Sequence, residues 1–318
     1  MTCMGIKTPA FTTCARHRIY KSILASELSE ELQLGGYMDK KQIEIQDVQD
    51  FWTKNPMIYN SAKSMSPEQI LENSVSKTRF KGWYLQEPNK PLFSNLIDFS
   101  SLKDNNVLEV GYGVGFLARE FIDAGVKYTG IDLSSFHHEI CLKLFGHHDN
   151  SKFYLGNAED LPFEDNSFDY VISQGVMHHS PDTQKCIDEA WRVLKEGHTL
   201  FVMLYHKNFL KYYYNKFFKY GILRGEYFRY RSIQKVAEKH TDAHGDGTGA
   251  PISRHYKVSD IPILFNKFSS RRHQIYGGYA ELKGFPSARF NIGQFMSDNL
   301  KQKILKKHGG YLYIWAVK

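Results

Sequence analysis

The stretch LEVGYGVGFLARE, residues 108–120, places three glycines at alternate positions directly after a short apolar run. A buried strand, a glycine-rich turn and a helix form the nucleotide-binding unit of doubly wound α/β folds. The dinucleotide version of that turn is Gly-x-Gly-x-x-Gly, which would put the third glycine at position 116. Phe116 stands there and the third glycine is Gly115. The spacing therefore argues against NAD as the ligand.

Strands and helices alternate on both sides of this turn. Apolar periodicity and helix-ending glycines predict each element. The predicted strands are 106–110, 126–133, 152–158, 168–175 and 198–206, and the predicted helices are 116–125, 134–146 and 182–197, the last ended by Gly197. Strict alternation predicts a parallel, doubly wound α/β sheet.

Length and composition bound the class of protein. A chain of 318 residues with 42% hydrophobic residues has room for one full domain with additions and for a sizeable core. No run of 18 apolar residues occurs, so a membrane-spanning helix is not expected. Four widely spaced cysteines without a Cys-x-x-Cys pair predict reduced thiols, a cytoplasmic protein and no zinc site.

The N-terminal stretch is basic. Its first 26 residues contain Lys7, Arg16, Arg18 and Lys21 and no acidic residue. Organelle transit peptides have this composition. The alternative, which we favour, is a poorly ordered and dispensable leader over residues 1–37.

Asp132 stands at the end of the second predicted strand, beyond the glycine turn. An acid at this place accepts hydrogen bonds from ribose hydroxyls. NAD and S-adenosylmethionine both need it, but only NAD needs a glycine at position 116. Asp132 and Phe116 together favour S-adenosylmethionine.

Four spaced segments resemble the class I S-adenosylmethionine-dependent methyltransferases, and most closely their type 11 small-molecule group. They are EVGYGVG (109–115), GIDLS (130–134), GNAEDLPFEDNSFDYV (156–171) and SQGVMHHSPDTQKCIDEAWRVLKEG (173–197). Residues 259–268 and 309–318 resemble the helix before strand six and the antiparallel last strand. The resemblance implies a Rossmann-like, mostly parallel seven-stranded sheet with an N-terminal cap and a helical lid insertion after strand five. The implied divisions are a helical cap (38–103), a cofactor-binding core (104–206), a basic aromatic insertion with a lid loop (207–256) and a C-terminal helix and strands (257–318).

The resemblance also implies the cofactor contacts. Glu109 would take the methionine amino group, and the three glycines would admit the methionine backbone. Asp132 would bind the ribose, and Ala158 would offer its N–H to adenine. Asn157 stands where many relatives carry Asp, although an amide oxygen still accepts a hydrogen bond. The full set is Glu109, Gly111, Gly113, Gly115, Asp132, Leu133, Asn157, Ala158, Glu159 and Gln174.

Methyl transfer from a sulfonium requires that the attacking atom of the acceptor be aligned with the methyl group. A general base is needed only where that attacking atom carries a proton that must be removed. His178 and His179 follow the fourth strand at the ligand-binding edge and are candidate bases; alternatively they only shape the pocket. The pairs His137–His138 and His147–His148 are expected to be solvated. Neighbouring helical residues point apart, so no metal site is expected.

Residues 207–240 carry the whole net charge of the chain. They hold nine Lys or Arg against two Glu, 9 − 2 = +7, together with ten aromatic residues. Phe209, Tyr213, Phe217 and Tyr220 would form one helical stripe. The segment is interpreted as an amphipathic lid over the pocket, with two alternatives: a helix on an anionic membrane surface through 207–231, or a nucleic-acid groove.

Substrate contacts are predicted at both ends of the fold. Residues 240–256 are a glycine-rich loop, in which Arg254 could clamp an acidic substrate group beside His255; alternatively the loop is a surface connector with Arg254 in a salt bridge. Aromatic residues of the cap, Trp52, Trp83 and Tyr84, would cover the substrate together with Tyr205; alternatively the two tryptophans only anchor the cap to the sheet.

The predicted function is methyl transfer from S-adenosylmethionine to a small molecule, which an acidic group would suit. Arg254, His178 and His179 are the predicted catalytic residues. The alternatives are an RNA methyltransferase that uses 207–240, and a non-catalytic binding protein that keeps the cofactor fold. The fourth strand is followed by SQGV (173–176), not by the Asn-Pro-Pro-Tyr turn of amino-group methylases of adenine or glutamine.

Overall fold

The computed structural model describes residues 45–56, 65–80, 93–242, 249–278, 281–282, 286–287, 290–291 and 295–318. The chain divides into two units, residues 1–42 and 43–318, and every described residue belongs to the second. The predicted leader lies outside the described residues, as do Trp83, Tyr84 and part of the lid loop, 243–248.

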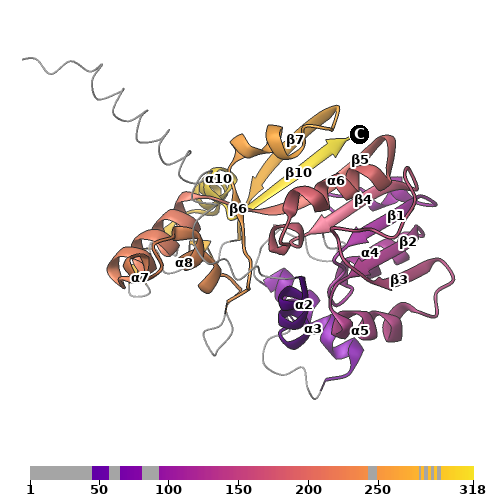
Figure 1. Ribbon diagram of the computed structural model, residues 1–318, viewed down its shortest axis with the longest axis horizontal. Helices are drawn as coiled ribbons and strands as arrows, with labels where there is room; N and C mark the ends of the chain where they lie inside the picture. Colours follow the sequence, from indigo (N-terminus) through magenta and orange to yellow (C-terminus); the bar gives the residue numbers. More distant parts are fainter. Residues whose placement is uncertain are drawn as a thin grey trace, which may run out of the picture. The chain divides into compact units, whose positions relative to one another are not determined.

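A mostly parallel sheet carries the fold (Figure 1). Its strand order is β3-β2-β1-β4-β5-β10-β7, and short β6 pairs with β5. The neighbours from β3 to β5 are parallel, whereas β10 is antiparallel to both β5 and β7. The strands are β1 Asn106–Val110, β2 Lys127–Asp132, β3 Ser151–Leu155, β4 Phe168–Gln174, β5 Leu194–His206, β6 His255–Tyr256, β7 Ser270–Tyr276 and β10 Tyr311–Val317. The predicted sheet is confirmed, with β6 as an eighth strand.

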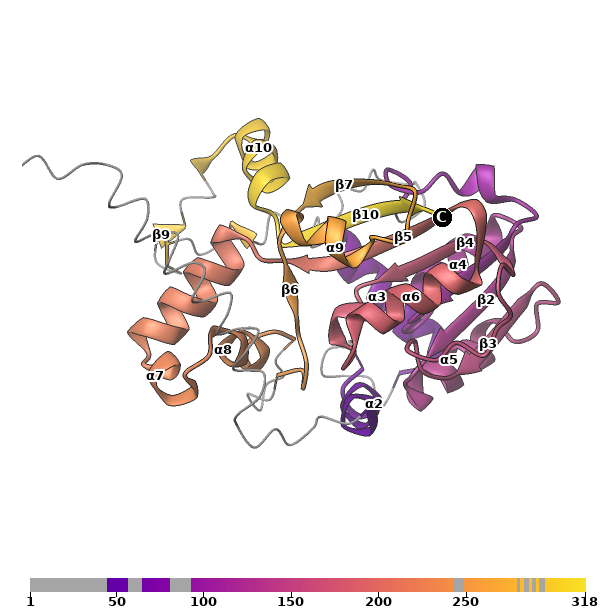
Figure 2. The same cartoon turned by 45° about the horizontal axis from the view of Figure 1, so that its top comes forward.

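Helices cover both faces of this sheet (Figure 2). Successive residues of β1 point to opposite faces. Val107 packs with Leu117 of α4, and Leu108 packs with Ile187 of α6. One face is covered by α3 Pro67–Phe80, α4 Phe116–Asp123 and α5 Ser135–Phe145, and the other by α6 Thr183–Val193 and α9 Ile261–Leu264. The fold is therefore doubly wound, as predicted.

The helix before β5 ends earlier than predicted. Gly197 was expected to end it, but α6 stops at Val193 and Leu194 is already extended. Leu194 pairs with Phe168 of β4, and the register then shifts before Thr199 pairs with Tyr170. Gly197 provides a positive φ of 75° inside this irregular start of β5. Pairing with the sheet therefore decides where the helix ends.

The insertion after β5 consists of η5 Phe209–Leu223, α7 Glu226–Tyr230 and α8 Ile233–Lys239. The first of these is a π-helix, in which the N–H of Tyr213 donates to the carbonyl of Asn208, 3.1 Å away. Bonding across five residues changes which side chains share a face. Leu210 and Tyr212 are buried and Tyr213 is exposed, so the predicted stripe through Tyr213 is wrong.

The remaining described elements are short helices and strands outside the main sheet and its covering helices. They are α2 Ile45–Lys54, η3 Phe99–Leu102, η4 Met177–His179, η6 Val258–Asp260, β8 Pro286–Ser287, β9 Phe290–Asn291 and α10 Asp298–His308. Over the described part of the chain, no helix has the length and apolarity needed to cross a membrane.

Candidate active site

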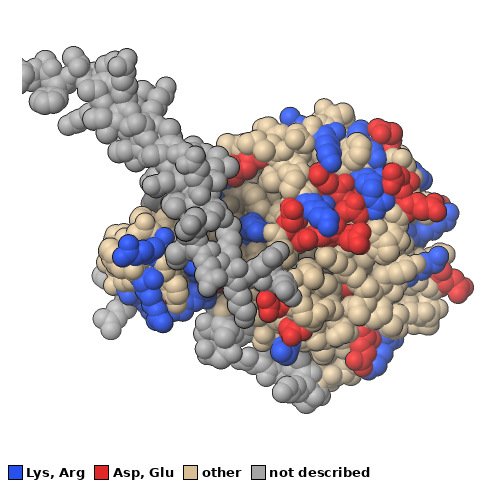
Figure 3. Space-filling view, in the orientation of Figure 1, with Lys and Arg blue, Asp and Glu red and all other residues tan. Residues whose placement is uncertain are grey.

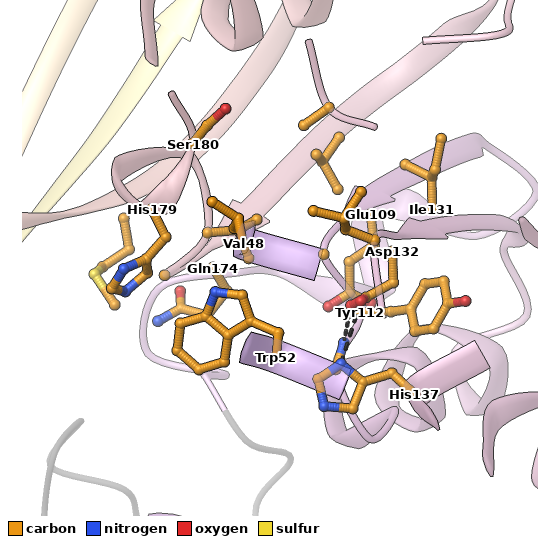
Figure 4. Close-up of a pocket in the computed structure, with 18 of the residues that line it drawn as sticks. Val48, Trp52, Glu109, Tyr112, Ile131, Asp132, His137, Gln174, His179 and Ser180 are labelled. Atoms are coloured by element: carbon orange, nitrogen blue, oxygen red, sulfur yellow. Dashed lines mark hydrogen bonds and ion pairs between the residues drawn. The ribbon is translucent and has the colours of Figure 1, made fainter. Parts of the chain in front are cut away.

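A cavity of about 230 Å³ opens at the carboxyl ends of the parallel strands (Figure 4). Ligands of open α/β sheets bind at this edge. One side of the cavity is formed by the turn after β1 and the ends of β2 and β4, and the other by α2 with Ile45, Val48 and Trp52. Eight predicted cofactor residues line it: Glu109, Gly111, Gly113, Asp132, Leu133, Asn157, Ala158 and Gln174.

The three glycines of the turn differ in what they do. All have positive φ, at 82° for Gly111, 55° for Gly113 and 85° for Gly115. A Cβ on Gly111 would lie 2.2 Å from a methyl group of Val176, and one on Gly115 would lie 2.6 Å from the ring of Phe145. A Cβ on Gly113 would meet no protein atom within 4 Å. Gly113 therefore leaves room for a ligand, whereas Gly115 serves packing and lies outside the cavity lining.

Asp132 is held by three protein donors. Its Oδ2 accepts from the N–H of Gly113 at 2.8 Å, and its Oδ1 accepts from the N–H of Ser134 at 2.8 Å. The Nδ1 of His137 lies 3.2 Å from Oδ1. A carboxylate offers about four lone pairs, so one acceptor position remains for a ribose hydroxyl. The same carboxylate thus ties the glycine turn to α5 and faces the cavity.

Glu109 is almost completely buried at the end of β1. The hydroxyl of Tyr128 donates to its Oε2 at 2.6 Å. Burial, with a further contribution from the charge of Asp132, raises the pKa of Glu109 to about 8 despite that hydrogen bond. Near neutral pH the side chain is therefore mostly protonated, and an ammonium group placed against it would favour the carboxylate.

The adenine segment is only partly as predicted. Asn157 and Ala158 line the cavity, and the amide oxygen of Asn157 accepts from the N–H of Glu159 at 3.0 Å. The carboxylate of Glu159 instead accepts from the hydroxyl of Ser180 and from the N–H of Asp182. Glu159 is not among the described lining residues. It fixes the turn before α6, so the prediction of Glu159 as a cofactor-binding residue is corrected.

His178 is enclosed beside the cavity and is absent from its described lining. Its ring lies 3.9 Å from that of Tyr205. Burial, reinforced by the neighbouring His179 and His255, lowers the pKa of His178 well below the ordinary value. The ring is therefore neutral, but an acceptor molecule in the cavity does not reach it.

His179 lines the cavity, but both of its ring nitrogens face protein acceptors. Nδ1 lies 2.6 Å from the carbonyl oxygen of Ile252, and Nε2 lies 3.3 Å from a carboxylate oxygen of Asp242. The hydroxyl of Tyr205 donates to the same carboxylate at 2.9 Å. Hydrogen bonds from His179 and Tyr205 lower the pKa of Asp242 against the effect of its burial. This arrangement favours the pocket-shaping alternative over a base.

Arg254 and His255 do not line the described cavity. The guanidinium of Arg254 donates to the carbonyl of Ser180, and the backbone N–H of Arg254 donates to the carbonyl of His178 at 2.9 Å. His255 packs against Tyr205 and Tyr212. Arg254 therefore ties the segment before β6 to η4, which corrects the predicted clamp on an acidic substrate.

Several site residues were missed by the sequence analysis. His137 was expected to be solvated, but it is buried against Asp132 because α5 begins directly behind that carboxylate. Tyr311 comes from the antiparallel β10, and Met203 comes from β5. Asp242 reaches His179 from the far end of the insertion. Only the position of His137, one turn after a predicted ribose acid, could have been noticed in the sequence.

The described residues contain no group of three or more His, Cys, Asp or Glu side chains placed to hold a metal ion.

Replacing Asp132 with alanine is expected to weaken S-adenosylhomocysteine binding by about 1.5–3 kcal/mol, the size of a hydrogen bond to a charged group. The loss of the Gly113 anchor adds to this effect. Calorimetric titration of the folded variant measures it, with circular dichroism as the check on folding. An unchanged dissociation constant would place the ribose elsewhere.

Comparisons with known proteins match the part of the chain that forms the cofactor edge of this cavity. The family described as "Methyltransferase domain" matches residues 108–202. A phosphoethanolamine N-methyltransferase of Caenorhabditis elegans is 38% identical over 106 residues, which cover 32% of this chain and 24% of that protein. A sterol 4-C-methyltransferase of the same organism is 30% identical over 123 residues, covering 37% of each chain.

A ubiquinone/menaquinone biosynthesis C-methyltransferase of Rickettsia prowazekii is 39% identical over 105 residues, covering 29% of this chain and 41% of that protein. The chain thus spans less than half the length of these relatives. The matched residues contain the glycine turn, Asp132 and the ends of β1, β2 and β4. Residues 108–202 are therefore a class I S-adenosylmethionine-dependent methyltransferase domain, and S-adenosylmethionine is its cofactor.

Proposed function

We propose that the chain transfers the methyl group of S-adenosylmethionine to an uncharged, largely apolar small molecule bound in the cavity. The observation that carries the proposal is the continuity of the cavity. It joins the cofactor edge at Gly113 and Asp132 to an apolar part lined by Trp52, Met203 and Tyr311. Among the described lining residues there is no Lys or Arg, which argues against an acidic acceptor.

The residues present fit the cofactor. A Cβ at Gly113 would meet no protein atom within 4 Å, so the backbone there leaves room for the cofactor. Glu109 and Asp132 are the carboxyl groups of the described lining, and they suit a cationic ligand. S-adenosylmethionine, when bound, supplies an activated methyl group on a sulfonium. The chain contributes binding and orientation, and α2 shields the cavity from water, which strengthens electrostatic interactions inside it.

The histidines limit the chemistry of the acceptor. His178 is enclosed, and both nitrogens of His179 face protein oxygens. Neither ring is therefore well placed to take a proton from a molecule in the cavity. We therefore propose an acceptor whose attacking atom needs no prior deprotonation by these histidines, which is compatible with nitrogen or carbon nucleophiles.

Replacing Trp52 with alanine tests this proposal. The variant is expected to raise KM for the acceptor by at least tenfold, because it loses aromatic contact area at the apolar part of the cavity. Acceptors are found by transfer of labelled methyl from S-adenosylmethionine to a panel of neutral aromatic and aliphatic compounds. Affinity for S-adenosylhomocysteine should stay within about threefold, since Asp132 and Gly113 are intact.

Asp50, exposed on α2 and outside the described lining, is the control. Asp50→Ala should leave KM nearly unchanged. Cofactor binding without transfer to any acceptor would favour a non-catalytic binding protein. Transfer only to RNA, with binding that falls steeply as salt rises, would favour the RNA methyltransferase alternative.

A further inference from the structure

The insertion after β5 bears an exposed group of apolar and cationic side chains, here named the basic tip. Its elements η5, α7 and α8 pack on one another and lie apart from β1 to β4 (Figures 1 and 2). Lys and Arg gather over these elements in Figure 3, whereas acidic and basic side chains mix over the sheet. The basic tip comprises Phe218, Leu223, Arg224, Phe228, Arg229 and Arg231.

The apolar members of the basic tip are unusually open to solvent. Leu223 and Phe228 are each 68% exposed, and Phe218 is 45% exposed. A lid that only covers the cavity would turn such side chains inward. Large apolar groups that gather on a surface mark a site of interaction with another surface.

The arginines of the basic tip have no acidic partner in the part of the chain that the structure describes. Glu226 is the only carboxylate in the sequence 207–231, and it faces His240 at 2.8 Å and Lys239 at 3.6 Å. Among the described residues, no carboxylate pairs with Arg224, Arg229 or Arg231. The one acid within 207–231 is therefore neutralised by its neighbours, and these arginines are left for an anionic partner.

Two tyrosines of the insertion, Tyr220 and Tyr230, are poorly placed to stack on nucleic-acid bases. The ring of Tyr220 is stacked on His240 at 3.8 Å, and the guanidinium of Arg224 lies 4.9 Å from its centre. Arg229 and Lys239 lie over Tyr230, each at 5.6 Å. Single-stranded nucleic acids need open aromatic faces. The apolar side chains that remain open are aromatic at Phe218 and Phe228 but aliphatic at Leu223, and this mixture suits acyl chains better than stacked bases.

We propose that the basic tip docks the protein on a membrane surface that contains anionic phospholipid. Leu223 and Phe228 enter the boundary between headgroups and acyl chains, and Arg224, Arg229 and Arg231 pair with lipid phosphates. The membrane is a peripheral surface here and not a spanned one. The proposal goes beyond methyl transfer and does not depend on it.

Sedimentation of the full chain with vesicles tests the proposal. Wild-type protein should bind phosphatidylcholine vesicles that contain roughly 30% phosphatidylserine and show little binding to phosphatidylcholine alone. The triple variant Arg224→Gln, Arg229→Gln, Arg231→Gln should lower the partition coefficient about 100-fold. Leu223→Ser with Phe228→Ser should lower it at least tenfold, because apolar insertion is lost.

Matched controls lie elsewhere on the surface. Lys303→Gln, Lys306→Gln and Lys307→Gln remove three exposed cations from α10, and Ile263→Ser removes a 71% exposed apolar residue from α9. These variants should bind vesicles within about threefold of wild type. Thermal melting and S-adenosylhomocysteine titration report folding and cofactor binding separately from vesicle binding.

Three outcomes would overturn the proposal. Tip variants that bind anionic vesicles like wild type would exclude the basic tip as the docking site. An equal loss in the α10 variant would indicate net charge alone. Tip variants that lose binding to an RNA oligonucleotide but keep vesicle binding would assign the surface to nucleic acid.

Discussion

Replacing Gly111 with alanine is expected to lower the free energy of unfolding by about 2–6 kcal/mol. About 1–3 kcal/mol comes from forcing a residue with a Cβ to a φ of +82°, and about 1–3 kcal/mol comes from overpacking. The new Cβ would lie 2.2 Å and 2.7 Å from the two methyl groups of Val176. Because valine is stiff at χ1, it cannot turn aside. Denaturant unfolding measures the loss.

Two further variants separate the causes. Gly111→Ala combined with Val176→Ala removes the methyl contacts but keeps the backbone strain, so it should recover part of the stability. Gly113→Ala should cost only about 1–2 kcal/mol of stability, because its φ is +55° and its Cβ meets no protein atom. Gly113→Ala should instead weaken S-adenosylhomocysteine binding at least tenfold. Equal stability losses at both glycines would contradict this division of roles.

Replacing Glu109 with glutamine is expected to remove a large pH dependence of stability. The folded pKa of Glu109 is raised from 4.5 to about 8 by burial. Between these values the folded chain binds a proton that the unfolded chain has lost. Stability is therefore fully present below about pH 4.5 and falls as the pH rises to about 8, by about 1.4 kcal/mol for each pH unit.

The variant isolates this effect because glutamine keeps the shape and its amide oxygen accepts from Tyr128. Relative to wild type, Glu109→Gln should gain about 4 kcal/mol in unfolding free energy between pH 5 and pH 8. Glu139→Gln, on the exposed face of α5, is the control. A hydrogen bond from Lys143 lowers the pKa of Glu139, so this variant should leave the profile between pH 5 and pH 8 unchanged. Parallel profiles for wild type and Glu109→Gln would show that this carboxyl ionises with an ordinary pKa.

The order of strands and helices, the glycine turn and the ribose acid were predictable from the sequence. Each depends on short-range signals: apolar periodicity, positive-φ glycines and an acid at a strand end. Parallel strands that follow one another then bring their carboxyl ends to a common edge. This topology predicts that the glycine turn and Asp132 meet at one cavity, whereas Glu109, Asn157 and Ala158 were predicted there from the resemblance to the methyltransferases.

Only the tertiary structure decided how the remaining side chains are used. Glu159 is one residue from Ala158, yet it turns to Ser180 because the N–H of Asp182 needs an acceptor there. His179 is held by Asp242 and Ile252, which come from a distant insertion that no local pattern links to it. The π-helical bonding of η5 buries Leu210 and Tyr212 and leaves Tyr213, a member of the predicted stripe, in solvent. These contacts form between residues that are distant in the sequence and compete for the same hydrogen-bond partners. A sequence pattern reports only on residues that are close along the chain.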